Sequence, residues 1–209
     1  KRIKDNNQGK NTGGMGSYSP VPKVNQELME KIMDSIIEPT CRGLQQEGID
    51  YRGILYAGLM ISEGRPYLLE YNCRFGDPET QAVLPRMEDD LLPWLLDCSQ
   101  AKLKDTPIQW SDESCVCVVL ASAGYPETSS KGDIIKGLEK LAETSNIMVF
   151  HAGTAFHQNH LVTDGGRVLG VVGKAASFEQ ARQNIYAAIK NIDFRGKQFR
   201  KDIALNVGR

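Results

Sequence analysis

The spacing of apolar residues predicts one long helix near the start of the chain. Apolar side chains recur every three or four positions over residues 25–46, and Gly48 follows them. Pro39 interrupts this pattern, so we expect the helix to kink or divide there. The same kind of spacing predicts shorter helices over residues 78–87, 91–101 and 177–192.

Apolar runs between these helices predict strands. Residues 52–61 and 66–71 flank a turn that contains Gly64, which is typical of a hairpin. A Val-rich run over 115–121 predicts a core strand on which Cys115 and Cys117 share one face. Residues 147–150 predict a further strand. Residues 160–163 and 167–172 flank an Asp–Gly–Gly sequence and are predicted to form a second hairpin.

The polar segments predict how the chain is divided. Residues 5–20 concentrate Asn, Gly, Ser and Pro and are expected to be loop. A polar stretch with Pro107 separates helical from strand patterns, which predicts one unit over residues 1–105 and another over 106–209. The second unit reads as a small α+β domain, and α+β is the fold class predicted for the whole chain.

Composition and charge exclude several classes of protein. The formal net charge is −1, which gives no general attraction to nucleic acid or to an acidic membrane surface. No apolar run approaches the roughly 20 residues that cross a bilayer. The first ten residues are mostly polar and basic and the chain opens on Lys1, so we expect it to begin inside a longer polypeptide. Five scattered cysteines without CxxC spacing favour buried, reduced thiols in a cytoplasmic protein.

The most informative polar residues follow an i, i+2 pattern at the end of the predicted strand. Glu70 and Asn72 leave the same face of a strand, and both offer the oxygen ligands that Mg²⁺ prefers. Arg74 takes the next step and would place a guanidinium beside that metal. The spacing alone fits an exposed polar stripe equally well. Leu68 and Leu69 favour a substantially buried strand, whose polar face would need partners.

A glycine-rich segment and a turn provide the second signal. Residues 11–16 read NTGGMG, in which successive backbone N–H groups can form an anion nest, although such a turn is more often a connector. It has neither the Walker spacing nor a preceding strand. Asp77 precedes Pro78 and is predicted to cap a helix with exposed N–H groups.

Taken together, these segments resemble one family. The runs that carry the resemblance are NTGGMGSYSP at 11–20, LYAGLM at 55–60, EYNCRFGDPE at 70–79, GYP at 124–126, FHAGT at 150–154, GGRVL at 165–169 and RKDI at 200–203. They occur in the same order in glycinamide ribonucleotide synthetases, which are ATP-grasp ligases. The chain is similar to the carboxy-terminal half of these enzymes.

The resemblance implies a fold and a reaction. The fold is the carboxy-terminal part of an ATP-grasp domain followed by a small α+β domain. In the reaction, ATP phosphorylates glycine and the amine of 5-phosphoribosylamine displaces phosphate from the resulting glycyl phosphate. The remaining ATP contacts would come from a missing amino-terminal part of the same polypeptide.

The resemblance also implies roles for individual residues. Glu70 and Asn72 would bind Mg²⁺ or Mn²⁺, and Arg74 would steady developing negative charge. Lys1 and Arg2 would reach the ATP phosphates. The glycine and phosphoribosyl pocket would be lined by Asn11, Thr12, Gly13, Gly14, Met15, Gly16, Asp77, Pro78 and Glu79.

Two other functions remain open at this point. A different ATP-grasp ligase would share Glu70, Asn72 and Arg74, although residues 11–16 and 75–79 favour the phosphoribosylamine enzyme. A non-catalytic module of the same fold would be expected to lose the metal pair, which is intact here. A zinc site at His157 and His160 is disfavoured because no cysteine or carboxylate lies at ligand spacing.

Overall fold

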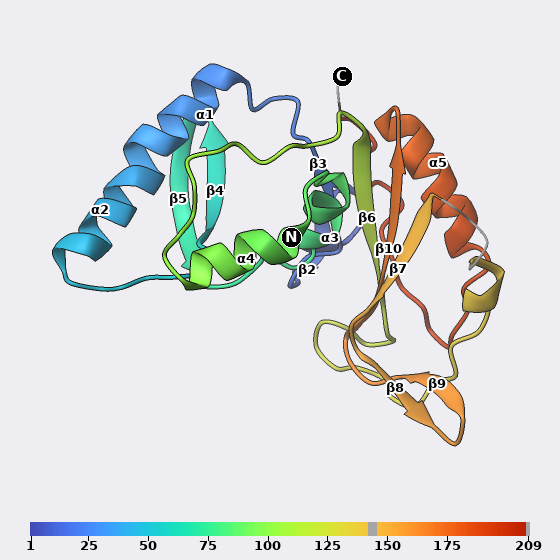
Figure 1. Ribbon diagram of the computed structural model, residues 1–209. Coiled ribbons are helices and arrows are strands. Elements are labelled where there is room, and N and C mark those ends of the chain that lie inside the picture. Colours follow the sequence, from blue (N-terminus) through green and yellow to red (C-terminus); the bar gives the residue numbers. More distant parts are fainter. Residues whose placement is uncertain (142–145, 208–209) are drawn as a thin grey trace.

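The computed structural model of the protein describes residues 1–141 and 146–207. Figure 1 shows a long helix and a two-stranded hairpin on one side, and a four-stranded sheet with its own helix on the other. The helices are α1 (Gln26–Ile32), α2 (Glu38–Gln46), α3 (Thr80–Val83), α4 (Leu91–Ser99) and α5 (Phe178–Ile189). Short 3₁₀ turns lie at Asp5–Asn7, Leu84–Arg86 and Leu138–Leu141.

The predicted long helix forms, and it is interrupted near Pro39 as expected. The Asn25 side chain caps its start by accepting a hydrogen bond from the Leu28 N–H at 2.9 Å. A π-helical segment, Met33–Ile37, separates α1 from α2. Because Pro39 cannot donate a backbone hydrogen bond and its ring crowds the preceding turn, a widened turn just before it relieves the conflict.

The first predicted hairpin also forms. Strand β4 (Tyr56–Ser62) pairs antiparallel with β5 (Arg65–Asn72) around Glu63 and Gly64, which both have positive φ, as two-residue hairpin turns require. The expectation that β5 is largely buried is wrong, since Leu68 is 41% and Leu69 64% exposed. Helix α1 contacts β5, but most residues of β5 remain exposed.

A four-stranded antiparallel sheet forms the centre of the other side. Its order is β3 (Gly16–Ser19), β6 (Ser114–Ala121), β10 (Arg167–Ala175) and β7 (Ile147–His151). Residues 5–20 were expected to be loop, yet they contain β3 and also β2 (Gln8–Asn11), which pairs with β1 (Arg2–Lys4). The backbone partners of β3 lie far later in the chain, where local composition gives no sign of them.

The second predicted hairpin is wrong in its pairing. Strand β9 (His160–Thr163) pairs with β8 (Thr154–His157) through a turn at Gln158 and Asn159, both of positive φ. Both edges of β10 are occupied by β6 and β7, so β9 cannot add to it. The Asp–Gly–Gly sequence therefore links the β8–β9 hairpin, which projects at the bottom of Figure 1, to the sheet.

The core lies on both faces of β6, all of whose residues are buried. One face packs against α5 and contains Val116, Val118 and Leu120. The other packs against α3 and contains Cys115, Cys117 and Val119, with Ala82 of α3 fully buried against them. Figure 1 shows α3 and α5 on opposite sides of the sheet. The predicted shared face of the two cysteines is confirmed.

The other cysteines depart from the expectation of buried thiols. All five are free, but Cys41 and Cys73 are exposed and Cys98 is half-buried. Burial raises the pKa of Cys115 to about 11 and raises that of Cys117 further. These two thiols are therefore core side chains without nucleophilic character at neutral pH. Within the part of the chain that the structure describes, no helix has the length and apolarity to span a membrane.

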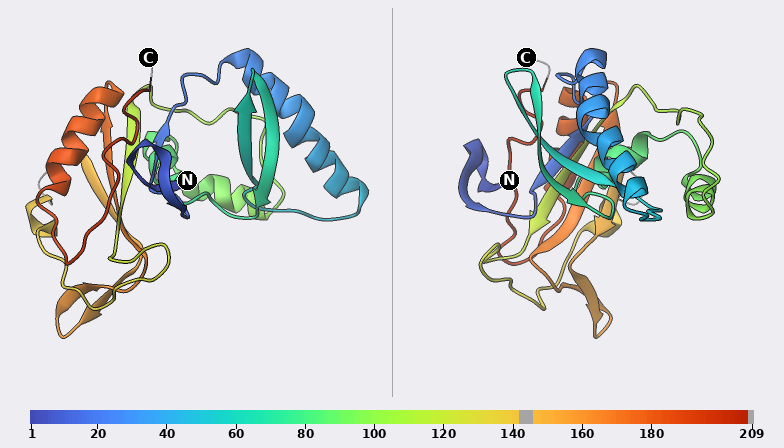
Figure 2. Two further views of the ribbon diagram at one scale, coloured as in Figure 1. Left: turned by 180° about the vertical axis from the view of Figure 1, so that it is seen from behind. Right: turned by 90° about the vertical axis from the view of Figure 1, so that its left-hand side faces the viewer.

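The two ends of the described chain are held together by charged hydrogen bonds. Asp202 accepts from the guanidinium of Arg200 at 2.8 Å and from the Asn6 N–H at 2.8 Å. Asp5 in turn accepts from the Lys201 N–H at 2.7 Å. Figure 2 shows the amino-terminal hairpin in blue beside this red segment. The Arg200 hydrogen bonds lower the pKa of Asp202 to about 2, and the Asn6 N–H adds to the effect.

This pKa predicts a pH-dependent contribution to stability. Because the folded pKa lies below the ordinary value of 3.8, the stabilisation is present above about pH 4 and is lost as pH falls towards 2. Asp202→Asn should therefore lower the free energy of unfolding by about 2 kcal/mol at pH 7 and by little near pH 2. Denaturant titrations at both pH values measure this. Asp105→Asn, at an exposed carboxylate, is the matched control, and equal losses at both pH values would contradict the assignment.

A pair of glycine substitutions tests the close packing of β3. A Cβ at Gly16 would lie 2.6 Å from the Cys117 carbonyl oxygen, so Gly16→Ala should destabilise the protein by about 1–3 kcal/mol. A Cβ added at Gly43, in α2, would have no heavy atom within 4 Å other than those of its own helix backbone. Gly43→Ala should instead stabilise by about 0.5–1 kcal/mol, because alanine favours the helix. Thermal midpoints measure both, and a neutral Gly16→Ala would argue against the β3–β6 register.

Candidate functional site

The structure brings the glycine-rich segment and the turn at residues 75–79 into direct contact. The Ser17 hydroxyl donates to the Pro78 carbonyl oxygen at 2.6 Å across 61 positions of sequence. Gly14 has a φ of 121°, and a Cβ there would lie only 2.6 Å from Cδ of Pro78. Glycine is therefore needed at position 14 both for its backbone conformation and for this close approach.

A third segment, at the start of β10, joins the other two. Nη2 of Arg167 lies 2.9 Å from Oδ2 of Asp77, and Nη1 donates to the Asp77 carbonyl at 3.1 Å and to the Gly13 carbonyl at 3.3 Å. The sequence prediction assigned no role to Arg167. The one signal that could have found it is its place in the GGRVL run at residues 165–169.

The anion nest expected from the glycine-rich segment is not formed by its first amides. The N–H of Thr12 donates to the Lys1 carbonyl at 2.8 Å, and that of Gly13 to the Tyr125 hydroxyl at 2.9 Å. The N–H of Gly14 donates to the Thr12 hydroxyl at 3.1 Å. These three backbone N–H groups, which the sequence predicted to bind an anion, thus already donate to oxygen atoms of the protein.

Asp77 does not cap a helix as predicted. Helix α3 begins at Thr80, whose N–H donates to the Gly76 carbonyl at 3.0 Å. The Asp77 carboxylate instead accepts from the Gln81 amide at 2.9 Å and pairs with Arg167. Its charge thus connects the turn to β10, and no side chain in the described part of the chain caps the start of α3.

Glu70 and Asn72 lie two positions apart on β5, as predicted, so their side chains leave the same face. Glu70 is exposed and Asn72 half-buried. Gly58 lies opposite Glu70, and a Cβ there would come within 3.0 Å of the Glu70 Cγ, so glycine leaves room for the carboxylate to turn. Two oxygen donors with open space suit Mg²⁺, which keeps several waters or phosphate oxygens. Among residues 1–141 and 146–207 there is no larger cluster of metal-binding side chains.

The predicted cations differ in how they relate to this pair. Arg74 lies beside it, donating to Oδ1 of Asn72 at 3.3 Å and to the Phe75 carbonyl at 2.8 Å. Lys1 reaches the turn, with its ammonium 3.7 Å from Oε1 of Glu79. Arg2 instead donates to the Gly9 carbonyl at 3.1 Å. The structure thus brings Lys1 and Arg74 to the site through their contacts with Glu79 and Asn72, whereas Arg2 lies in the β1–β2 hairpin.

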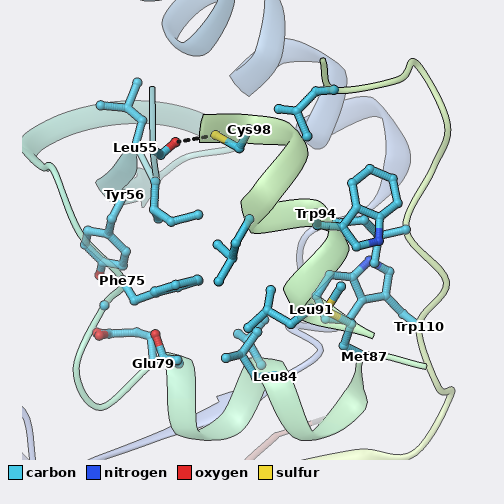
Figure 3. Close-up of a pocket in the computed structure, with 18 of the residues that line it drawn as sticks. Leu55, Tyr56, Phe75, Glu79, Leu84, Met87, Leu91, Trp94, Cys98 and Trp110 are labelled. Atoms are coloured by element: carbon cyan, nitrogen blue, oxygen red, sulfur yellow. Dashed lines mark hydrogen bonds between the residues drawn. The ribbon is translucent and has the colours of Figure 1, made fainter. Parts of the chain in front are cut away.

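An apolar cavity of about 600 Å³, absent from the sequence prediction, borders the turn. Figure 3 shows Tyr56, Phe75 and Glu79 at one end and two tryptophans at the other. Burial raises the pKa of Tyr56 to about 12, and the negative charge of Glu79 adds to this. The tyrosine therefore stays protonated at neutral pH. The remaining wall includes Leu55, Leu84, Met87, Leu91, Trp94 and Trp110.

Comparison with known proteins identifies the family on both sides of the fold. Residues 1–80 match the ATP-grasp (A) domain of phosphoribosylglycinamide synthetase, and residues 115–206 match its C domain. A phosphoribosylamine–glycine ligase of Neisseria meningitidis is 48% identical over 98% of this chain, which covers 48% of that protein. A chloroplastic one of Arabidopsis thaliana is 45% identical over 97% of this chain and 39% of its own length.

Solved structures agree with these matches. The crystal structure of a phosphoribosylamine–glycine ligase from Thermotoga maritima superposes with a TM-score of 0.83 at 39% identity, over 97% of this chain and 49% of that one. A biotin carboxylase domain superposes with a TM-score of 0.64 at 14% identity, which reflects the shared fold alone. The chain spans about half the length of the curated relatives it matches. It belongs to the phosphoribosylglycinamide synthetase family, with an α+β fold related to the ATP-grasp enzymes.

Proposed function

We propose that this chain supplies the metal and substrate end of a phosphoribosylamine–glycine ligase. The proposed reaction joins glycine to 5-phosphoribosylamine and converts ATP to ADP and phosphate. The observation that carries the proposal is the convergence of residues 11–17 with residues 75–79, directly after the strand that bears Glu70 and Asn72. The names of the relatives in Neisseria and Arabidopsis agree with it.

Glu70 and Asn72 would hold a divalent cation, Mg²⁺ or Mn²⁺, through one carboxylate and one amide oxygen. The cation would neutralise phosphate charge at the site. Because Arg74 donates to the same Asn72 oxygen, it would turn towards the phosphate or acyl oxygens when that oxygen binds the cation. No side-chain nucleophile is required, since the protein positions the reactants and stabilises charge.

The substrates would lie beside the contact between the glycine-rich segment and the turn, against both of them. The Glu79 carboxylate fits an ammonium or amine, and the cations Lys1 and Arg74 fit phosphate or carboxylate groups. Asp77, which is already paired with Arg167, would line the pocket through its fixed position. Residues 11–16 would form the wall against which the smaller substrate rests. The remaining ATP contacts would come from the amino-terminal half that the relatives contain, which we propose belongs to the same polypeptide.

The first test is ADP release by a polypeptide that carries this chain behind such an amino-terminal half. We expect release to require Mg²⁺ or Mn²⁺, glycine and 5-phosphoribosylamine, each omitted in turn. Turnover with another carboxylate in place of glycine would indicate a different ATP-grasp ligase. An absence of turnover with all substrates present would favour a non-catalytic module and overturn the proposal.

The metal assignment makes a separate prediction in the same extended polypeptide. Glu70→Gln should reduce metal-dependent ADP formation by about 100-fold or more, because the cation loses its one charged protein ligand. The thermal midpoint should barely change, since Glu70 is exposed. Glu63→Gln, at the turn of the same hairpin, is the matched control and should retain turnover. Undiminished turnover in Glu70→Gln would exclude this carboxylate as the ligand.

A further inference from the structure

The glycine-rich segment receives its main fixed contacts from the carboxy-terminal sheet. Arg167, the first residue of β10, forms three hydrogen bonds that end on Gly13 and Asp77. Tyr125, in the loop after β6, accepts from the Gly13 N–H at 2.9 Å. Both polar groups of the Gly13 backbone are therefore bonded to side chains more than a hundred positions later in the chain.

The packing around these two side chains leaves little room for alternatives. A Cβ at Gly13 would lie 3.0 Å from Cζ of Arg167, so the guanidinium lies against the backbone at that point. A Cβ at Gly166 would lie 2.3 Å from the Tyr125 ring, so the residue before Arg167 lies against the tyrosine. Arg167 is only 23% exposed and its partner Asp77 48%. The contact thus sits at the edge of the site with one face open to solvent.

The chemistry of the contact requires arginine in particular. Its planar fork serves a carboxylate and two carbonyl oxygens at once, which a lysine ammonium on a flexible stem cannot reproduce. We infer that Arg167 and Tyr125 are positioning residues, which hold Gly13 and Asp77 in register so that the two walls of the substrate site keep a fixed separation. This inference rests on the proposed function for its catalytic consequence, although its structural part does not.

The structural part is tested by amide hydrogen exchange in the extended polypeptide, without any substrate present. Arg167→Lys and Tyr125→Phe should each raise the exchange rate of the Gly13 amide by about tenfold, because the loop loses an anchoring hydrogen bond. Arg182→Lys is the matched control, since Arg182 also donates to backbone carbonyls, those of Lys201 and Ile203, beside α5. It should leave Gly13 unchanged. Unchanged exchange in both test variants would overturn the inference.

The catalytic part is tested in the extended polypeptide by separating KM from kcat. Arg167→Lys should raise KM for glycine or 5-phosphoribosylamine by about tenfold, with KM for ATP within about twofold of the wild type. Arg182→Lys should change neither kcat nor the KM for any substrate. An equal rise in KM for ATP, or no change in any KM, would contradict a positioning role.

The two measurements test the proposed function and the positioning role independently of each other. If the wild-type extended polypeptide releases no ADP, the proposed function is lost, and Gly13 exchange alone then decides the role of Arg167 and Tyr125. Faster exchange would support the anchoring contact and unchanged exchange would reject it. If the wild type turns over normally while both variants behave like Arg182→Lys, the function stands and the positioning role is rejected.

Discussion

The burial of β6 on both faces is the constraint on which the rest of the structure depends. A strand without a solvent-facing side needs a layer on each side of it. Helix α5 covers one face, and the short helix α3 covers the other, where Ala82 packs in a buried cluster with Cys115 and Cys117. Because α3 directly follows residues 75–79, packing on β6 also fixes that turn. Pairing of β3 along the edge of β6 fixes the glycine-rich segment that precedes it. One buried strand thus delivers both walls of the candidate site.

The hydrogen bonds within those walls determine which polar groups remain available to bind a ligand. The amides of Thr12, Gly13 and Gly14 are already bonded to protein oxygens, so they contribute rigidity more than affinity. Recognition of charged groups is left to side chains. Of these, Arg167 is compensated by Asp77, whereas Arg74 donates only to neutral oxygens in the described part of the chain. The positive charge that remains available for an anion therefore lies beside the Glu70–Asn72 pair, where phosphate oxygens and a cation would have to meet.

Local patterns predicted what local forces determine. The helix around α5, the Val-rich strand β6 and the β4–β5 hairpin follow from apolar spacing and turn residues, and the side on which Glu70 and Asn72 lie follows from the two-residue period of a strand. The errors share a different cause. Strand β3, the pairing of β9 and the role of Asp77 all depend on partners far away in sequence, which composition does not reveal. Arg167 escaped notice for the same reason, because its partners are at positions 13 and 77.

These long-range contacts cross the division that the sequence predicts at about residue 105. The family matches end at residue 80 and resume at 115, which agrees with two evolutionary units, and the division into two structural domains stays a prediction. Strand β3 belongs to the first stretch of sequence but pairs within the sheet of the second. Arg167 crosses between the stretches in the opposite direction, from the sheet to Gly13 and Asp77. Any hinge motion between such units would have to break an antiparallel pairing and a charged hydrogen-bond cluster together. If the predicted division holds, the candidate site lies at a joint that resists opening, which would suit the proposed reaction because its catalysis depends on holding reactants at fixed separation.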